Sequence, residues 1–187
     1  GYKMMSGTSM ATPQMTGASA VVLERVQNDP LFSSLNDRQK VDVVQNLIMG
    51  TAVPVVDPGQ GGGAYYSPRK QGAGLANLEA ATNSSVYPTV NGATDASRPK
   101  ADLGDGTNGW HFDVTLHNVS DTPATYELSS QALSENIEGG FFTGHSTDWN
   151  GKGVSVSFSG SSVTVPAKGE TTVGIDIKPG NEFAQYL

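Results

Sequence analysis

The hydrophobic pattern of this 187-residue chain changes period near position 85, and that change most restricts its possible folds. Residues 1–82 have apolar residues at helical spacing, whereas after about residue 86 apolar and polar residues alternate between turn-forming residues. A period of 3.6 predicts helices, and a period of two predicts half-buried strands. We therefore expect an α+β chain, with helices in residues 1–85 and an antiparallel β-sandwich in residues 86–187.

Two helices are expected in the first part. Residues 10–27 are rich in small and apolar side chains, which predicts a helix packed tightly on several sides and stopped by residues 28–30. Asn36 and Gln39 have the spacing of a capping box that begins a second helix, and Gly50 would end it. The apolar positions of this second helix are Val41, Val44, Leu47 and Ile48.

The second part contains five short segments with alternating apolar and polar residues. They are 110–117, 124–128, 154–158, 163–165 and 173–177. In the first of them, alternate residues from Trp110 onward are apolar, and the other face, with His111 and His117, is expected to meet solvent. Turn residues separate the segments, so we expect a sandwich of about seven strands. Residues 131–152 have no clear pattern and are expected to form a long connection.

Composition excludes several kinds of partner and site. The chain has 18 acidic and 11 basic residues, and its net charge of −7 disfavours nucleic acid or an anionic membrane surface as the main partner. It has no cysteine, so disulfide scaffolds, thiol catalysis and Cys-ligated zinc are excluded. No apolar run approaches the roughly 20 residues that span a bilayer.

A group of oxygen donors near residue 105 leaves two interpretations open. The group consists of Asp102, Asp105, Asn108 and Asp113. It could bind Ca²⁺ or form a solvated turn, and because the spacing of an EF-hand is absent we expect the turn. We therefore expect no metal or cofactor in this chain, and calcium is left open for a full-length protein.

The heptapeptide Gly7–Pro13 contains the strongest candidate for a catalytic residue in the chain. A serine hydroxyl becomes a nucleophile when a base takes its proton and a sharp turn holds it exposed. Gly7 would let a substrate backbone approach, and Ser9 at a helix start would offer a free N–H and the positive dipole end to an oxyanion. Capping rules alone allow another interpretation, in which Thr12 caps the helix and Pro13 occupies its first position.

The heptapeptide Gly-Thr-Ser-Met-Ala-Thr-Pro resembles the nucleophile signature of subtilisin-like serine proteases over all seven residues. Residues 2–6 look like the strand before the nucleophile, and residues 47–52 look like the end of the next helix. Residues 67–74 are similar to the segment that closes the catalytic domain in large cell-envelope proteinases of Gram-positive bacteria, the lactocepin-like branch. The resemblance implies the C-terminal part of a subtilisin-like catalytic domain at 1–85 and a fibronectin type III-like β-sandwich at 86–187.

The resemblance also implies that Ser9 is the nucleophile and that its N–H is one oxyanion donor. The Asp, the His and the oxyanion-hole Asn of the family would all precede Gly1. The three histidines of the chain, His111, His117 and His145, follow Ser9 and are expected to be ordinary solvent-exposed residues. The chain is therefore expected to be a fragment that requires upstream catalytic-domain residues and is inactive alone.

These implications lead us to expect part of an extracellular serine endopeptidase, associated with the cell wall or cell surface of a Gram-positive bacterium. It would cleave protein or peptide substrates through a Ser-His-Asp triad. An alternative is a non-catalytic surface spacer or adhesion module that binds protein or glycan. Trp110, Tyr126 and Trp149 could stack on a sugar, although the alternating pattern around the first two favours burial.

Overall fold

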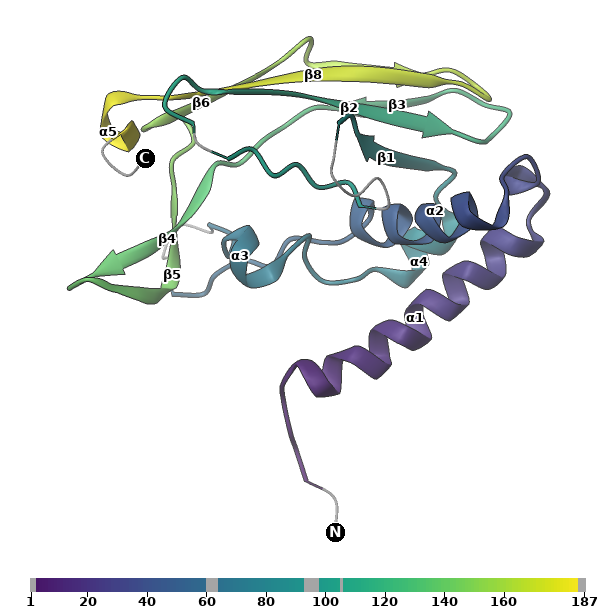
Figure 1. Cartoon of the computed structure of the whole chain (residues 1–187), viewed down its shortest axis with the longest axis horizontal. Coiled ribbons are helices and arrows are strands. Elements are labelled where there is room, and N and C mark those ends of the chain that lie inside the picture. The colour runs from purple at the N-terminus through teal and green to yellow at the C-terminus, as the bar shows by residue number, and fades with distance from the viewer. Residues whose placement is uncertain (1–2, 60–63, 93–97, 105, 185–187) are drawn as a thin grey trace.

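The computed structural model describes residues 3–59, 64–92, 98–104 and 106–184. Its helices are α1 (Thr8–Asn28), the 3₁₀ turn η1 (Pro30–Phe32), α2 (Asp37–Gly50), α3 (Pro68–Gln71), α4 (Leu78–Asn83) and α5 (Asn181–Ala184). Its strands are β1 (Val86–Val90), β2 (Trp110–Asn118), β3 (Ala124–Glu127), β4 (Leu133–Glu138), β5 (Phe141–Asp148), β6 (Val154–Phe158), β7 (Ser162–Val165) and β8 (Glu170–Pro179). Apart from α5, the helices precede the strands, and the expected α+β class is confirmed (Figure 1).

Helix α2 forms as its sequence predicts. The Asn36 side chain accepts from the Gln39 N–H at 3.0 Å, and the Gln39 side chain accepts from the Asn36 N–H at 3.0 Å. These bonds are the two halves of a capping box, so the expected start of this helix is confirmed. Leu47 and the neighbouring Val44 and Ile48 are buried.

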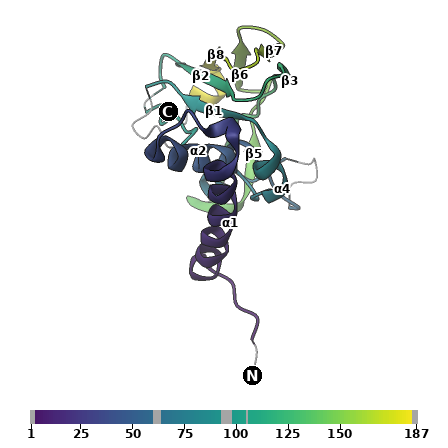
Figure 2. The same cartoon turned by 90° about the vertical axis from the view of Figure 1, so that its right-hand side faces the viewer.

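The helices share one hydrophobic core with the first strand of the sheet. The buried members of this core are Val22, Val26, Phe32, Val43, Val44, Leu47, Ile48, Ala81 and Tyr87. Tyr87 belongs to β1, so the sheet completes the core that the helices begin. Figure 2 shows the helices lying on one side of the sheet, with α1 pointing away from it.

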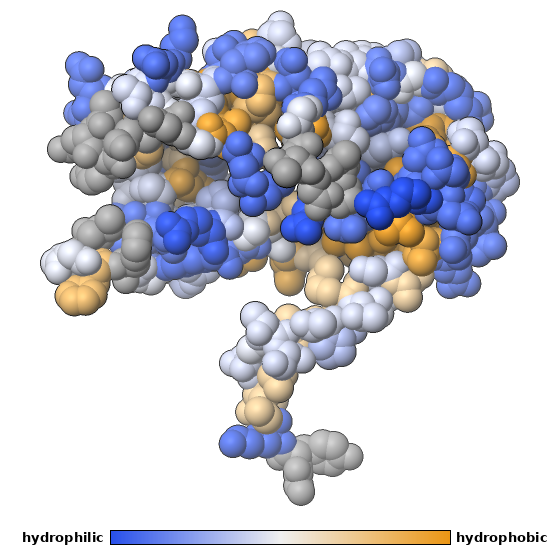
Figure 3. Space-filling model, in the orientation of Figure 1, coloured by the Kyte–Doolittle hydropathy of each residue, from blue (hydrophilic) through white to orange (hydrophobic). Residues whose placement is uncertain are grey.

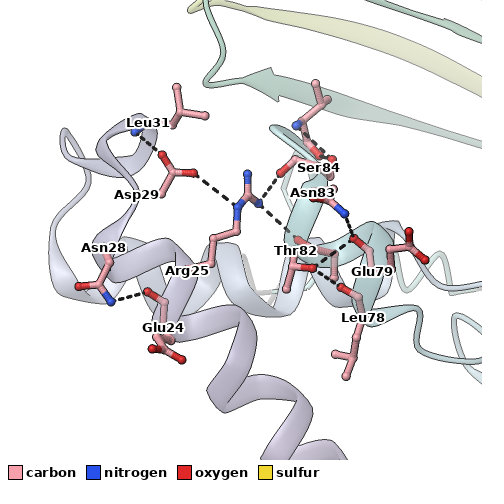
Figure 4. Close-up of polar contacts among 12 residues, drawn as sticks. Glu24, Arg25, Asn28, Asp29, Leu31, Leu78, Glu79, Thr82, Asn83 and Ser84 are labelled. Atoms are coloured by element: carbon pink, nitrogen blue, oxygen red, sulfur yellow. Dashed lines mark hydrogen bonds and ion pairs between the residues drawn. The ribbon is translucent and has the colours of Figure 1, made fainter.

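Arg25 fastens α1 to α4 at the edge of this core. Its Nη1 donates to the Ser84 carbonyl at 2.6 Å, and its Nε lies 3.5 Å from Asp29 Oδ2 (Figure 4). Its guanidinium also lies over the Phe32 ring, 5.1 Å from the centroid. Burial lowers the pKa of Arg25, and Asp29 opposes that effect. The contacts therefore join the C-terminal end of α1 firmly to the rest of the chain.

The N-terminal half of α1 extends away from the molecule (Figures 1 and 2). Only Ala18, Val22 and Val26 of this helix are buried. The expectation of a helix packed on several sides is therefore wrong for its first half. Small residues permit close packing, but no described element lies against this half to provide it.

The strands form three antiparallel groups. A four-stranded sheet has the order β1-β2-β8-β6, and β3 pairs with β7, which contacts β2 and β8. All five expected strand segments are confirmed. Pro88 lies in β1 at the edge of the sheet, where its missing N–H costs no bond to a neighbouring strand.

The third group, β4–β5, corrects the expectation for residues 131–152. This segment contains a β-hairpin rather than a long irregular connection. Gly139 and Gly140 form its turn with φ of 58° and 83°, the positive values that a tight hairpin turn requires. The strands themselves are rich in Ser, Thr and Glu, so they show little of the apolar alternation that marks a strand.

Candidate functional site

Ser9 lies exposed in the first turn of α1. Gly7 is the residue that precedes the helix, and its φ of 150° is a value that favours glycine. The Gly7 carbonyl accepts from the N–H groups of Met10 at 3.0 Å and Ala11 at 3.1 Å. The helix therefore begins at Thr8, and the Ser9 N–H is one of the first-turn donors that have no acceptor inside the helix.

The capping interpretation of Thr12 and Pro13 is wrong. Thr12 lies inside α1, and its Oγ1 donates to the Thr8 carbonyl at 2.8 Å. Pro13 is also inside the helix and has no N–H to offer the Ser9 carbonyl. Both the N–H and the C=O of Ser9 consequently lie outside the hydrogen-bond ladder of the helix.

This arrangement can stabilise negative charge but cannot by itself create a nucleophile. The positive end of the helix dipole and the free N–H of Ser9 both favour an oxyanion beside the hydroxyl. A base must still come within hydrogen-bond reach of the hydroxyl to take its proton. Figure 3 shows mostly pale side chains along the projecting part of α1, which are neither strongly hydrophilic nor strongly hydrophobic.

An apolar groove of about 570 Å³ runs between α1 and α2, farther along the helix than Ser9. Its lining residues are Met15, Thr16, Ser19, Ala20, Leu23, Val41, Val44, Gln45, Ile48 and Met49. Val41, which the helical pattern assigns to the buried face, is 44% exposed at this groove. The apolar face that the sequence predicts for α2 is thus covered only in part.

Two of the three histidines lie on β2 and bond to carboxylates of β8. His111 Nδ1 is 2.9 Å from Asp176 Oδ1, and the His111 side chain is 58% exposed. His117 Nδ1 is 3.1 Å from Glu170 Oε2, and its side chain is only 27% exposed. The Tyr87 ring stacks on His117 with centroids 4.9 Å apart, so the expectation of an ordinary exposed residue is wrong for His117.

The polar face of β2 is therefore less open to solvent than its pattern predicts. Thr115 is only 6% exposed, and its hydroxyl bonds to Asn91 at 3.0 Å and lies 2.8 Å from Thr172 Oγ1. His117 Nε2 lies 2.8 Å from Thr89 Oγ1. Because neighbouring strands supply polar partners, this face can be buried without losing its hydrogen bonds.

The third histidine, His145, bonds to a buried carboxylate. Its Nδ1 lies 3.2 Å from Oδ1 of Asp57, a residue that is 1% exposed, while the His145 side chain is 47% exposed. None of the bonds and ion pairs of the three histidines reaches Ser9. Asp57 and His145 lie 88 positions apart, and the sequence contains no signal that pairs them.

The folded structure shifts the pKa values of the two β2 histidines in opposite directions. The hydrogen bond to Asp176 raises the pKa of His111, whereas burial lowers the pKa of His117 despite Glu170. The stabilisation from His111 is complete below its unfolded pKa of about 6.5 and is lost as the pH rises through its folded pKa. For His117, stability is lost as the pH falls from about 6.5 through its lowered pKa.

Proton NMR titration of the imidazole Cε1–H signals tests this order. The midpoint of His111 should lie above that of His117. Asp176→Asn should lower the His111 midpoint and leave the His117 midpoint in place. A His117 midpoint above that of His111 would contradict the assignment of partners.

The oxygen donors near residue 105 fall partly outside the described residues, because Asp105 is not among them. Asp102 Oδ1 pairs with Lys100 Nζ at 2.9 Å, and Asp113 Oδ1 lies 3.5 Å from His111 Nε2. Within the described ranges, no group of three or more His, Asp or Glu side chains is placed to hold a metal ion. In the same ranges no helix is long and apolar enough to cross a membrane.

Comparison with known proteins divides the chain into two matches. Residues 1–86 match the model of the Subtilase family, and residues 102–186 match the model of an Fn3-like domain. A C5a peptidase of Streptococcus pyogenes serotype M1 is 24% identical over 193 residues, which cover 100% of this chain and 15% of that protein. A PI-type proteinase of Lactococcus lactis subsp. cremoris is 29% identical over 180 residues, which cover 89% of this chain and 9% of that protein. The chain thus spans 15% or less of the length of either relative.

Proposed function

This chain joins a Subtilase-family segment, residues 1–86, to an Fn3-like domain, residues 102–186, and from this premise we propose that it is part of an extracellular serine endopeptidase with Ser9 as nucleophile. The boundary between the two domains would lie at 85/86. The substrate would be a protein or peptide. Its place would be the cell wall or surface of a Gram-positive bacterium, which accords with the streptococcal and lactococcal relatives.

The position of Ser9 carries this proposal. Its hydroxyl is exposed in the first helical turn, beside its own free N–H and after a glycine at φ 150°. In the proposed step, Ser9 Oγ attacks a peptide carbonyl carbon while a histidine base takes its proton. The Ser9 N–H then stabilises the oxyanion, and the amine leaves with a proton from the same histidine. Water next cleaves the acyl-enzyme, and no metal or cofactor is needed.

The base would come from residues outside these 187. His111, His117 and His145 are each bonded to a carboxylate away from Ser9, which supports this part of the proposal. The aspartate that orients the base and a second oxyanion donor would also come from residues outside these 187. The 187 residues alone would therefore be inactive.

Labelling with a fluorophosphonate, which reacts with activated serine nucleophiles, tests both parts of the proposal. The full-length protein should be labelled, whereas its Ser9→Ala variant and the isolated 187-residue chain should not. Equal labelling of the full-length protein and its Ser9→Ala variant would exclude Ser9 as the nucleophile. Labelling of the isolated chain would refute the need for outside residues. A full-length protein that takes no label would instead favour the non-catalytic spacer or adhesion module.

A further inference from the structure

The β4–β5 hairpin is held by polar contacts against residues 53–59 and 64–72 of the first part of the chain, called loop 53–72 below. The hairpin lies beside α3, which belongs to this loop (Figure 1). On one side of the contact, Lys70 Nζ donates to the Thr143 carbonyl at 2.8 Å, and Arg69 Nε lies 3.5 Å from Glu135 Oε2. The loop is thus bound to both strands of the hairpin.

The centre of this contact is the carboxylate of Asp57, which is 1% exposed. Three donors surround it. The Gly59 N–H donates to Oδ1 at 2.9 Å, the Ser146 N–H donates to Oδ2 at 3.2 Å, and His145 Nδ1 lies 3.2 Å from Oδ1. Two of these three donors belong to the hairpin, so most of the compensation for a buried negative charge depends on docking of the hairpin.

The two surfaces fit closely around these bonds. The Ser67 N–H donates to Ser146 Oγ at 2.7 Å, and both serines are almost fully buried. A Cβ on Gly59 would clash with the His145 ring. The loop backbone therefore approaches the imidazole more closely than any other residue at position 59 would allow.

A neutral Asp57 would not suit this site. The N–H groups of Gly59 and Ser146 that face the carboxylate can only donate, and a cationic His145 also donates from Nδ1, so beside a cationic His145 the O–H of a protonated Asp57 would find no acceptor among them. His145 donates from Nδ1 as a cation or as the neutral tautomer with its proton on Nδ1, and an ionised Asp57 accepts from either form. The other charged groups of the contact, Lys70 and the Arg69–Glu135 pair, bond to different atoms.

We propose that the β4–β5 hairpin is a latch, which holds the second part of the chain against loop 53–72 while Asp57 is ionised and releases it when Asp57 is protonated. Docking and ionisation favour each other because the same donors serve both.

The direction of the pKa shift agrees with this geometry. Burial by itself raises the pKa of Asp57, but the bonds from Gly59, His145 and Ser146 outweigh it, and the pKa lies below its ordinary value. A carboxyl group with a lowered pKa stabilises the fold above its unfolded pKa of about 3.9, and this contribution is lost as the pH falls through its folded pKa. The latch should therefore open only below about pH 4.

Amide hydrogen exchange of the 187-residue chain tests the latch, with protection factors used to remove the intrinsic effect of pH. The amides of Ser67 and Ser146 report on it directly, because both donate across the contact. In the wild type their protection should fall as the pH is lowered below 4. In Asp57→Asn it should be at least tenfold lower at pH 6 and should fall less between pH 6 and 3 than in the wild type.

The matched control is Asp121→Asn, which neutralises an exposed carboxylate that lies 3.5 Å from Lys168 Nζ. It should leave the protection of Ser67 and Ser146 and its pH profile unchanged. Unchanged protection of Ser146 in Asp57→Asn, or wild-type protection that does not fall down to pH 3, would overturn the proposal. An equal loss of protection in β2 and β8 would also overturn it, because Asp57 would then support the whole fold.

A second variant removes one donor and keeps the carboxylate. His145→Ala should lower the protection of Ser67 and Ser146 by less than Asp57→Asn does and should leave β2 and β8 protected. It should also retain the fall below pH 4, since Asp57 still titrates. A His145→Ala variant with wild-type protection at both serines would show that the hairpin does not depend on this bond, and would contradict the latch.

Discussion

Replacement of Ser9 by alanine is expected to abolish peptide hydrolysis by the full-length protein, with a loss on the order of 10⁶-fold in kcat and little change in KM. The reason is that the covalent step would lose the hydroxyl that attacks the peptide carbonyl. Steady-state kinetics on a peptide substrate measure both constants. The stability should hardly change, since exposed side chains usually alter it by within about 0.5 kcal/mol.

The control for this variant is Ser34→Ala, which removes an exposed serine hydroxyl from the turn before α2. It should leave kcat and KM unchanged. If Ser9→Ala keeps a hundredth or more of the wild-type kcat, another group must act as the nucleophile. If KM rises sharply while kcat is kept, Ser9 contributes to substrate binding only.

Replacement of Phe32 by alanine is expected to reduce the free energy of unfolding by about 3–5 kcal/mol. The Phe32 side chain is 0% exposed within the core shared by the helices and β1, and the Arg25 guanidinium lies over its ring. Removing the ring would leave a cavity and take away one face of the Arg25 contact. Because a domain has only about 5–15 kcal/mol of stability in total, this loss is a large fraction of it.

Urea denaturation of the 187-residue chain, followed by circular dichroism, measures the change. Phe141→Ala is the matched control, because it removes the same side chain from a position that is 79% exposed. Its effect should be within about 0.5 kcal/mol. Equal destabilisation by the two variants would contradict the assignment of Phe32 to a core that the whole chain depends on.

The sequence predicts those elements whose stabilising contacts are local. The start of α2 depends on Asn36 and Gln39, which are three residues apart, and its buried face depends on Val44 and Leu47, which are also three apart. Contacts at such short separations leave a readable pattern in the chain. Strands β2 and β8 likewise follow from their alternation.

The β4–β5 hairpin and its latch could not be predicted in this way. Its strands are polar, and its main partner is loop 53–72, with which it shares the Asp57–His145 bond across 88 positions. A histidine with this partner has the same local sequence as an exposed one. Only the fold brings the carboxylate to it.

The sequence indicates Ser9 as a candidate nucleophile, but it does not determine the residue at which the helix begins. The heptapeptide indicates a serine near a helix start, yet capping rules also allow Thr12 as the cap and Pro13 as the first helical residue. In the structure Gly7, with its φ of 150°, is the residue before the helix, so the helix begins at Thr8, five residues before Pro13. The role of Ser9 as nucleophile stays a prediction until labelling and kinetics test it.

The missing hydrogen bond at the Ser9 carbonyl should also make the first turn of α1 sensitive to heat. Because Pro13 donates no bond to the Ser9 carbonyl, the first turn of α1 is tied to the next by one bond fewer than an ordinary turn. Local opening requires least free energy where few bonds and contacts must break. Heat is therefore expected to fray this turn while Val22 and Val26 still hold the other end of the helix in the core.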